Sequence, residues 1–178
     1  MINNINSITP LIETDARSTP SAAGSFKPED VNTLNESVPD YPEGFLERVA
    51  DQGKIVEWAP QEKVLAHPAI ACFLTHCGWS SVTESLSRGV PFLCWPSFGD
   101  QFHNQSYIND VWKAGLQLDL DENGSRSRDE IKNKILLLLS DGNFKENALK
   151  LKKMAEQTIG PDGSSFKNFE KFIMFLKN

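Results

Sequence analysis

From Tyr41 onward, short apolar runs alternate with amphipathic segments of helical length, and this alternation limits the fold of the 178-residue chain more than any other feature. Near-continuous apolar runs are typical of strands that are buried on both faces of a parallel sheet. Four segments have this character: 54–58, 71–75, 91–95 and 116–120. Helical segments between such strands form βαβ units, so the sequence predicts an α/β fold with a Rossmann-like parallel sheet.

Capping residues predict where the helices begin and end. Ser80 or Ser81 caps a helix that ends at Gly89, and a second helix covers about residues 104–113. Ser127 with Glu130 matches a capping box, ahead of a helix that stops at Asp141 and Gly142. Two later helices carry apolar stripes, which we interpret as core packing. The stripes are Phe144, Ala148, Leu151, Ala155 and Ile159 on the first, and Phe166, Phe169, Phe172, Ile173 and Leu176 on the second.

Composition limits the domain count and the partners. Residues 1–37 are rich in Ser, Thr, Pro, Asn and Ala, which predicts a poorly ordered segment, and residues 38–178 are expected to form one domain. The net charge of −6 and the lack of a basic run argue against nucleic acid. No apolar run reaches the roughly 18 to 20 residues of a membrane span, and the first residues, MINNINSITP, lack signal-peptide features, so a cytoplasmic protein is expected.

The cysteines predict buried thiols. Cys72, Cys77 and Cys94 are an odd number and lie in apolar segments, which favours reduced core thiols over disulfides. Together with His76 they offer zinc-ligand types, but their spacing fits no finger or ribbon pattern. We therefore predict no metal site.

The turn at residues 76–81, HCGWSS, follows a predicted strand and precedes a predicted helix. Small and hydroxylated residues there leave backbone N–H groups facing outward, and the helix dipole favours an anion at that end. Such a turn suits a diphosphate, although many α/β turns of this composition bind nothing. A second polar segment, ending in Asp100 and Gln101, follows the next strand, and ligands of open α/β sheets bind outside these carboxyl ends.

Residues 58–101 resemble the signature box of the plant family 1 UDP-glycosyltransferases. The resemblance lies in the WAPQ opening, the HCGW centre, Glu84, the GVP triplet and the closing Asp-Gln. The flanking segments YPEGFLERV, ENALKLKKMAEQ and GSSFKNFEKFI resemble the same family, so the likeness covers about residues 38–178. It implies the C-terminal, UDP-sugar donor-binding half of a GT-B fold. It also implies an inverting transferase of plant secondary metabolism that moves a hexose to a small-molecule hydroxyl, with UDP-glucose as co-substrate and no cofactor or metal.

The resemblance assigns the nucleotide end of the donor by position. Trp58 would stack on the uracil, the Ala59 backbone would contact the uracil edge, and Gln61 would lie near the ribose, whose hydroxyls Glu84 would hold. Without the resemblance, Trp58 would be interpreted as a core aromatic and Glu84 as a solvated helix residue.

The diphosphate and the sugar have their own assigned residues. His76, Ser81 and the local backbone, Gly78 included, would bind the diphosphate, whereas Trp79, Asp100 and Gln101 would meet the sugar. Taken alone, Asp100 would be a turn former.

Ser80 departs from the family, which usually has Asn after the HCGW tryptophan. Serine loses the reach of the amide, so we expect donor binding weaker by about 1 to 2 kcal/mol.

Two parts of the family pattern are missing. The acceptor-binding half, which supplies the catalytic histidine, has no counterpart here, so no catalytic residue is assigned and the isolated chain is predicted to be inactive. The join near residues 35–38 looks like an internal deletion of two strands and a helix, which would leave unpaired sheet edges.

In the family the C-terminus crosses onto the absent half, so the Phe-rich last helix would expose a face for protein docking or aggregation. The alternatives are a non-catalytic UDP-sugar-binding or partner-binding protein, and a truncated product without a stable fold.

Overall fold

A computed structural model of the protein describes residues 11–12, 41–56 and 58–177. Residues 41–56 belong to one compact unit, which contains α1 (Phe45–Val49), and the remaining described residues belong to another. The predicted deletion near residues 35–38, and the predicted disorder of residues 1–37 except at 11–12, lie outside the described residues.

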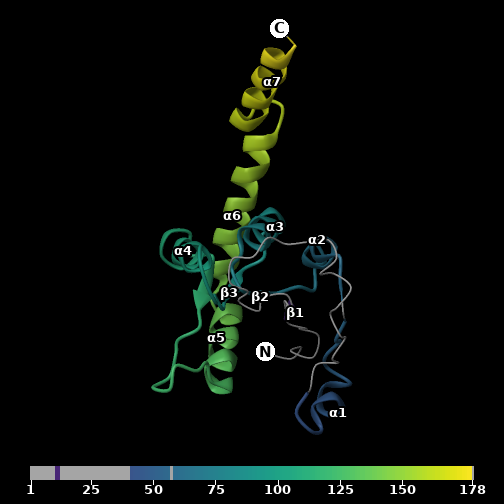
Figure 1. Ribbon diagram of the computed structural model, residues 1–178, viewed down its shortest axis with the longest axis vertical. Helices are drawn as coiled ribbons and strands as arrows, with labels where there is room; N and C mark the ends of the chain where they lie inside the picture. Colours follow the sequence, from purple (N-terminus) through teal and green to yellow (C-terminus); the bar gives the residue numbers. More distant parts are fainter. Residues whose placement is uncertain (1–10, 13–40, 57, 178) are drawn as a thin grey trace, which may run out of the picture. The chain divides into compact units, whose positions relative to one another are not determined.

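The larger unit is built on a parallel sheet of four strands in the order β1-β2-β3-β4 (Figure 1). The strands are β1 (Leu11–Ile12), β2 (Phe73–Thr75), β3 (Phe92–Cys94) and β4 (Gly115–Gln117). Every residue of β2 and β3 is buried, as the apolar runs predict for inner parallel strands. The α/β prediction and the last three predicted strands are confirmed.

The strand predicted at 54–58 is wrong for the residues that can be described. Lys54, Ile55, Val56 and Trp58 lie in no strand and are exposed. The apolar run at this position lacks the burial that stabilises an inner strand, so its composition alone does not form one.

Helices cover both faces of the sheet. Val82 of α3 (Trp79–Arg88) and Ala148 of α6 (Gly142–Ile159) pack with Phe92 and Cys94 on one face. Ile131 and Ile135 of α5 (Arg128–Ser140) pack with Leu93 on the other. Alternate residues of β3 thus face opposite helix layers, which is the layering expected of this fold class.

The remaining helices of the larger unit are α2 (Gln61–Leu65), α4 (Gln101–Ser106), its π-helical continuation η2 (Tyr107–Val111) and α7 (Ser164–Leu176). The second predicted helix therefore begins earlier than expected, at Gln101. No described helix is both long enough and apolar enough to cross a membrane.

The helix ends differ from prediction in two places. Gly78 is the N-cap of α3, so Ser80 and Ser81 lie within the first turn instead of capping it, whereas Gly89 ends the helix with a φ of 66° as expected. Ser127 caps α5 by accepting a hydrogen bond from the Glu130 amide at 3.1 Å. The Glu130 carboxylate accepts from the Asp119 amide at 3.0 Å instead of closing a capping box.

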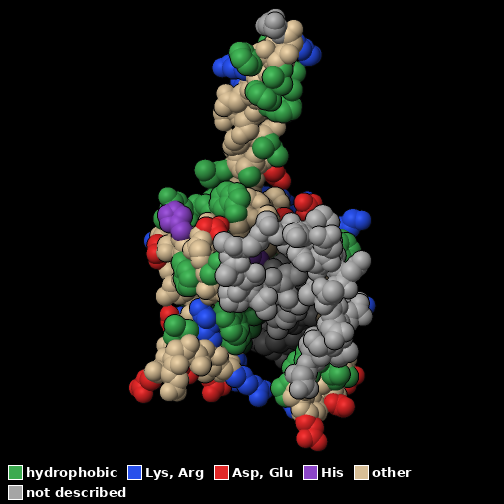
Figure 2. All heavy atoms as spheres, viewed as in Figure 1, with side chains coloured by type: hydrophobic (Ala, Val, Ile, Leu, Met, Phe, Trp, Pro, Cys, Tyr) green, Lys and Arg blue, Asp and Glu red, His purple; other side chains and the backbone are tan. Residues whose placement is uncertain are grey.

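The two apolar stripes are only partly buried. Ala148 of α6 is fully buried and Leu151 packs on the core, whereas Ile159 at the end of the helix is 67% exposed. No residue of α7 is buried, and Phe169 and Phe172 are more than half exposed. Figure 2 shows hydrophobic side chains gathered on this helix. Core packing is therefore wrong for α7, and the predicted exposure of its aromatic face is confirmed.

Cys72, Cys77 and Cys94 are buried free thiols, as predicted. Burial raises the pKa of Cys72 to about 11. The pKa of Cys94 is also raised, mainly by a hydrogen bond with Cys77 and to a smaller extent by burial. Cys72 and Cys94 therefore stay protonated at neutral pH in the native fold, because thiolates are disfavoured in an apolar core.

Candidate functional site

The loops that follow β2 and β3 start side by side at the carboxyl edge of the sheet. Thr75 and Cys94 are partners in register, and the Trp95 amide donates to the Thr75 carbonyl at 2.8 Å. The first loop leads into α3 and the second into α4 (Figure 1). This edge is where open parallel sheets bind ligands.

The first loop is a tight turn over residues 76–78. Cys77 has a φ of 67°, and its amide donates to the Thr75 hydroxyl oxygen at 3.2 Å. A Cβ at position 78 would collide with the His76 imidazole, lying 3.1 Å from its Cδ2 and closer still to its Nε2. A side chain at position 78 would therefore displace the imidazole, which lies against the backbone where α3 begins.

The start of α3 is suited to an anion. The first turn of this ten-residue helix carries no acidic side chain. Ser81 in that turn is buried, with 5% of its surface exposed, and His76 is half-buried just before it. Backbone N–H groups at a helix N-terminus and the helix dipole attract a phosphate group.

Gln61, Ser81 and Glu84 are brought together by α2 and α3. The Gln61 side-chain amide donates to the Glu84 carboxylate at 2.7 Å and to the Ser81 hydroxyl at 3.2 Å. Ser81 and Glu84 are three residues apart and so share one face of α3. The described partner of the Glu84 carboxylate is the neutral Gln61 amide, which leaves further oxygen lone pairs of the carboxylate to accept from the hydroxyls of a diol.

Two tryptophans of the predicted site are exposed. Trp58, shortly before α2, is 73% exposed, and Trp79, the first residue of α3, is 57% exposed. The core alternative for Trp58 is therefore wrong. Ala59 is half-buried beside Trp58, and Ser80 is exposed in the first turn of α3. Large exposed aromatic faces next to a polar cluster suit stacking on a planar ring or a sugar.

The second loop is held by its own side chains. The Gln101 carbonyl oxygen accepts from the backbone amides of Ser97 at 2.8 Å and Phe98 at 3.1 Å, and Gln101 is only 5% exposed. Asp100 is exposed just before α4, and its carboxylate accepts from the Asn104 amide at 3.0 Å. The loop thus presents the Asp100 carboxylate while using the Gln101 oxygen internally.

Asn104 is a residue of this site that the sequence analysis did not find. Its buried side-chain amide donates both to Asp100 and, at 2.9 Å, to the Cys77 carbonyl in the first loop. One side chain therefore ties the two loops together. Its spacing of four residues from Asp100 on a helical segment was the available signal.

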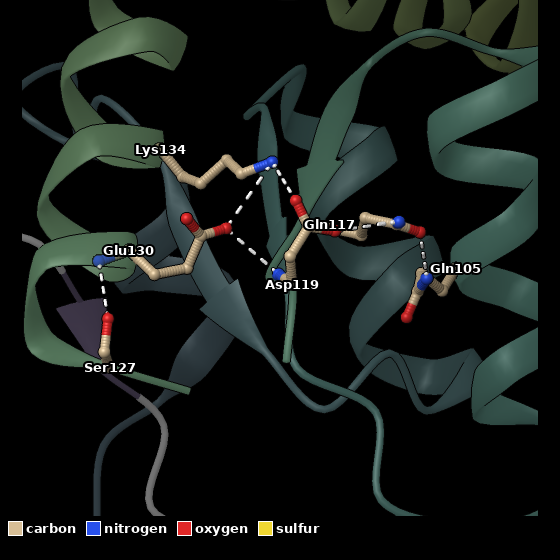
Figure 3. Close-up of polar contacts among 6 residues, drawn as sticks. All are labelled: Gln105, Gln117, Asp119, Ser127, Glu130 and Lys134. Carbon is tan, nitrogen blue, oxygen red and sulfur yellow. Dashed lines mark hydrogen bonds and ion pairs between the residues drawn. The ribbon is translucent and has the colours of Figure 1, made fainter. Parts of the chain in front are cut away.

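A separate polar network supports the end of β4 (Figure 3). The Gln105 amide donates to the Gln117 carbonyl oxygen at 2.7 Å, and the Gln117 amide donates to Asp119 at 3.2 Å. Lys134 donates to the Asp119 carboxylate at 2.8 Å, which lowers the pKa of Asp119 and raises that of Lys134. Lys134 also lies 3.5 Å from the Glu130 carboxylate, and the network joins α4, β4 and α5.

The described residues include no cluster of side chains with the composition of a metal site. Within residues 11–12, 41–56 and 58–177, no three His, Cys, Asp or Glu side chains form a group that could hold a metal ion. The described site offers hydrogen-bonding side chains, exposed aromatic faces and the N-terminus of α3.

Comparison with known proteins identifies related sequences and folds. The model of the UDP-glucoronosyl and UDP-glucosyl transferase family matches residues 37–162. A limonoid UDP-glucosyltransferase of Citrus unshiu is 49% identical over 82% of this chain and 29% of its own length. A putative UDP-glucose glucosyltransferase of Fragaria ananassa is 51% identical over 74% of this chain and 29% of its own length.

Solved structures resemble the chain to a similar extent. Os79 of O. sativa in complex with UDP and deoxynivalenol-3-glucoside superposes with a TM-score of 0.72 at 33% identity, over 74% of this chain and 31% of Os79. A UDP-glucose: anthocyanidin 3-O-glucosyltransferase in complex with UDP gives a TM-score of 0.69 at 36% identity, over 75% of this chain and 30% of that protein. The chain thus spans under a third of the length of these relatives.

Proposed function

Because the chain belongs to the UDP-glucoronosyl and UDP-glucosyl transferase family, we propose that it is the donor-binding part of a UDP-glucose-dependent plant glycosyltransferase. Its fold is part of the GT-B fold of its structural relatives. The observation that carries the proposal is the bonded cluster of Gln61, Ser81 and Glu84 beside the N-terminus of α3. In that cluster, the Glu84 carboxylate can accept hydrogen bonds from the two ribose hydroxyls, and the N-terminus of α3 beside it can bind an anion. A nucleoside diphosphate requires both features.

The nucleotide half of the ligand fits the first part of the site. Trp58 offers its exposed ring to the uracil, with the backbone of Ala59 at the edge of the base. Glu84, oriented by Gln61, accepts hydrogen bonds from the ribose hydroxyls. A carboxylate that accepts from a vicinal diol combines charge-assisted bonds with a fixed geometry.

The diphosphate and sugar fit the second part. The start of α3, with His76, Gly78 and Ser81, faces the diphosphate, and Ser80 lies in the same turn. Trp79 at the start of α3, and Asp100 and Gln101 at the start of α4, would contact the hexose. Gln101 would do so through its side-chain nitrogen, because its oxygen accepts from Ser97 and Phe98. Asp100 is held by Asn104, which gives its carboxylate a fixed direction toward a hydroxyl.

The proposed reaction transfers the hexose to an acceptor hydroxyl. The acceptor oxygen attacks the anomeric carbon, the bond from that carbon to the UDP oxygen breaks, and UDP leaves with inversion. The α3 N-terminus would stabilise the negative charge that develops on the diphosphate. A base must take the proton of the acceptor, and no residue of the described site is assigned to that step.

We propose that the chain alone binds the donor but does not turn it over, because it spans under a third of its relatives. The proposed docking surface is the aromatic face of α7, where Phe169 and Phe172 are more than half exposed. These side chains would pack against the part of the enzyme that this chain does not contain. The cytoplasmic location stays a prediction of the sequence.

The test is a transfer assay on the isolated chain with UDP-glucose and a flavonol, beside a donor-binding assay. A full-length relative serves as the positive control for transfer. We expect UDP-glucose to bind and no glucoside to form. Glucoside formation would refute the proposed inactivity of the isolated chain, whereas absence of UDP-glucose binding would refute the donor site.

A further inference from the structure

Arg126 contacts the second loop of the site from the turn between β4 and α5. Its Nη2 donates to the Pro96 carbonyl at 3.4 Å, and its guanidinium carbon lies 5.4 Å from the centre of the Trp95 ring. Trp95 and Pro96 are the first residues after β3, and the same loop continues to Asp100 and Gln101. The half-buried Arg126 side chain thus reaches the base of the segment that would contact the sugar.

The polar surroundings of Arg126 are incomplete. Its Nε is buried and has no hydrogen-bond partner among the described residues. No described Asp or Glu lies within ion-pair distance of its guanidinium, in contrast to Arg88 and Lys134. Buried donors without a partner are uncommon in native proteins, because they destabilise the fold. The position of Arg126 is therefore not explained by its contribution to local stability. The contacts that remain are the cation on the Trp95 ring and the bond to Pro96.

The internal bonds of the loop do not fix where the loop lies. Ser97 and Phe98 bond to Gln101 of the same loop, so these contacts define its shape. Its position depends on contacts to other elements. These include the Asn104 amide on the Cys77 carbonyl near α4 and the Arg126 side chain near β3.

We propose that Arg126 is a positioning residue for the sugar end of the donor site. By holding Trp95 and Pro96, it sets the direction from which Asp100 and Gln101 approach the hexose. The inference rests on the proposed function and deepens it, since it assigns donor-sugar selectivity to a residue outside the signature segment 58–101. Arg126 has no described contact with Trp58, Glu84 or α3, so the nucleotide end should be independent of it.

The experiment compares four chains: wild type, Arg126→Met, Arg126→Lys and Arg128→Met. Methionine keeps the length of the side chain without charge, and lysine keeps the cation over Trp95. Arg128, exposed at the start of α5, is the matched control. The first measurement is hydrogen exchange of the Trp95 amide, which donates to the Thr75 carbonyl outside the loop, in the unliganded protein. The second is the affinity for UDP-glucose relative to that for UDP.

In Arg126→Met we expect the Trp95 amide to exchange about fivefold faster or more, in line with the loss of one cation–π contact. We expect UDP-glucose affinity to fall by a similar factor while UDP affinity stays unchanged. Arg126→Lys should recover part of both effects, and Arg128→Met should show neither.

Unchanged exchange in Arg126→Met would overturn the positioning role whether or not the chain binds a nucleotide. Equal losses of UDP and UDP-glucose affinity would also overturn it, because a general structural effect weakens both. If wild type bound neither ligand, the proposed function would fail, and the exchange data would still decide whether Arg126 positions the loop.

Discussion

Replacing Glu84 with alanine should weaken UDP binding more than any other single change at the nucleotide end. The side chain supplies two carboxylate oxygens, one of which accepts from Gln61 at 2.7 Å. Alanine removes the acceptors for the ribose hydroxyls, and a hydrogen bond to a charged group contributes about 1.5 to 3 kcal/mol. The dissociation constant for UDP should therefore rise about 10-fold to 150-fold at 25 °C.

The same change should affect stability only slightly. Glu84 is half-buried, and the Gln61 amide retains its 3.2 Å hydrogen bond to Ser81 when Glu84 is absent. The expected loss in the free energy of unfolding is under about 1 kcal/mol. Thermal melting of the variant will show whether a loss of binding reflects a loss of folded protein.

Isothermal titration calorimetry with UDP measures the affinities. Glu146→Ala is the matched control, because Glu146 is an exposed residue of α6 whose described partner is Lys150, at 2.9 Å on the surface. We expect the control to bind UDP as wild type does. Equal affinity of Glu84→Ala and wild type, or an equal fall in the control, would refute the assignment of Glu84 to the ribose.

Three further predictions concern other parts of the chain. Ser80→Asn should tighten UDP binding by about 1 to 2 kcal/mol, since an amide adds a hydrogen bond toward the diphosphate; equal affinities in calorimetry would contradict this. Lys134 lowers the pKa of Asp119, so their pair stabilises the fold above the ordinary carboxyl pKa of 3.8, and its contribution is lost as the pH falls through the lowered pKa. Asp119→Asn should thus cost under about 1 kcal/mol in urea unfolding at pH 7, because Asp119 is exposed and solvent screens the pair. A cost that persisted below the lowered pKa would contradict the ion pair. The three buried cysteines should react with a disulfide reagent at pH 8 on the order of 100-fold more slowly in the native chain than in urea, and equal rates would mean that the core is open.

The strands and layers of the larger unit could be predicted because burial on both faces leaves a clear pattern. β2 and β3 lie within predicted apolar runs, and β4 overlaps the start of the run at 116–120. Ser127 caps α5, as its spacing from Glu130 suggests. The apolar run at 54–58 gave the same signal without forming a strand, because composition does not reveal whether the run is buried. The exposure of α7 could not follow from its stripe either, since a helical stripe is the same whether or not a partner covers it.

The binding roles of the site residues stay predictions, and the sequence did not indicate the contacts among them. The resemblance placed Gln61 and Glu84 at the ribose, and the structure joins them by a hydrogen bond between residues 23 positions apart. Asn104 and Arg126 were missed because their partners, Cys77 and Pro96, lie 27 and 30 positions away. Contacts over such separations depend on how the loops lie at the sheet edge, which no local pattern encodes.

Titration of the wild-type chain with UDP and UDP-glucose tests the central claim most directly. The chain used should first show protected cysteines, which establishes that its core is folded. The account predicts saturable binding of one UDP per chain, with UDP-glucose competing for the same site. A folded chain that binds neither ligand would contradict the donor site, even though the chain belongs to the family.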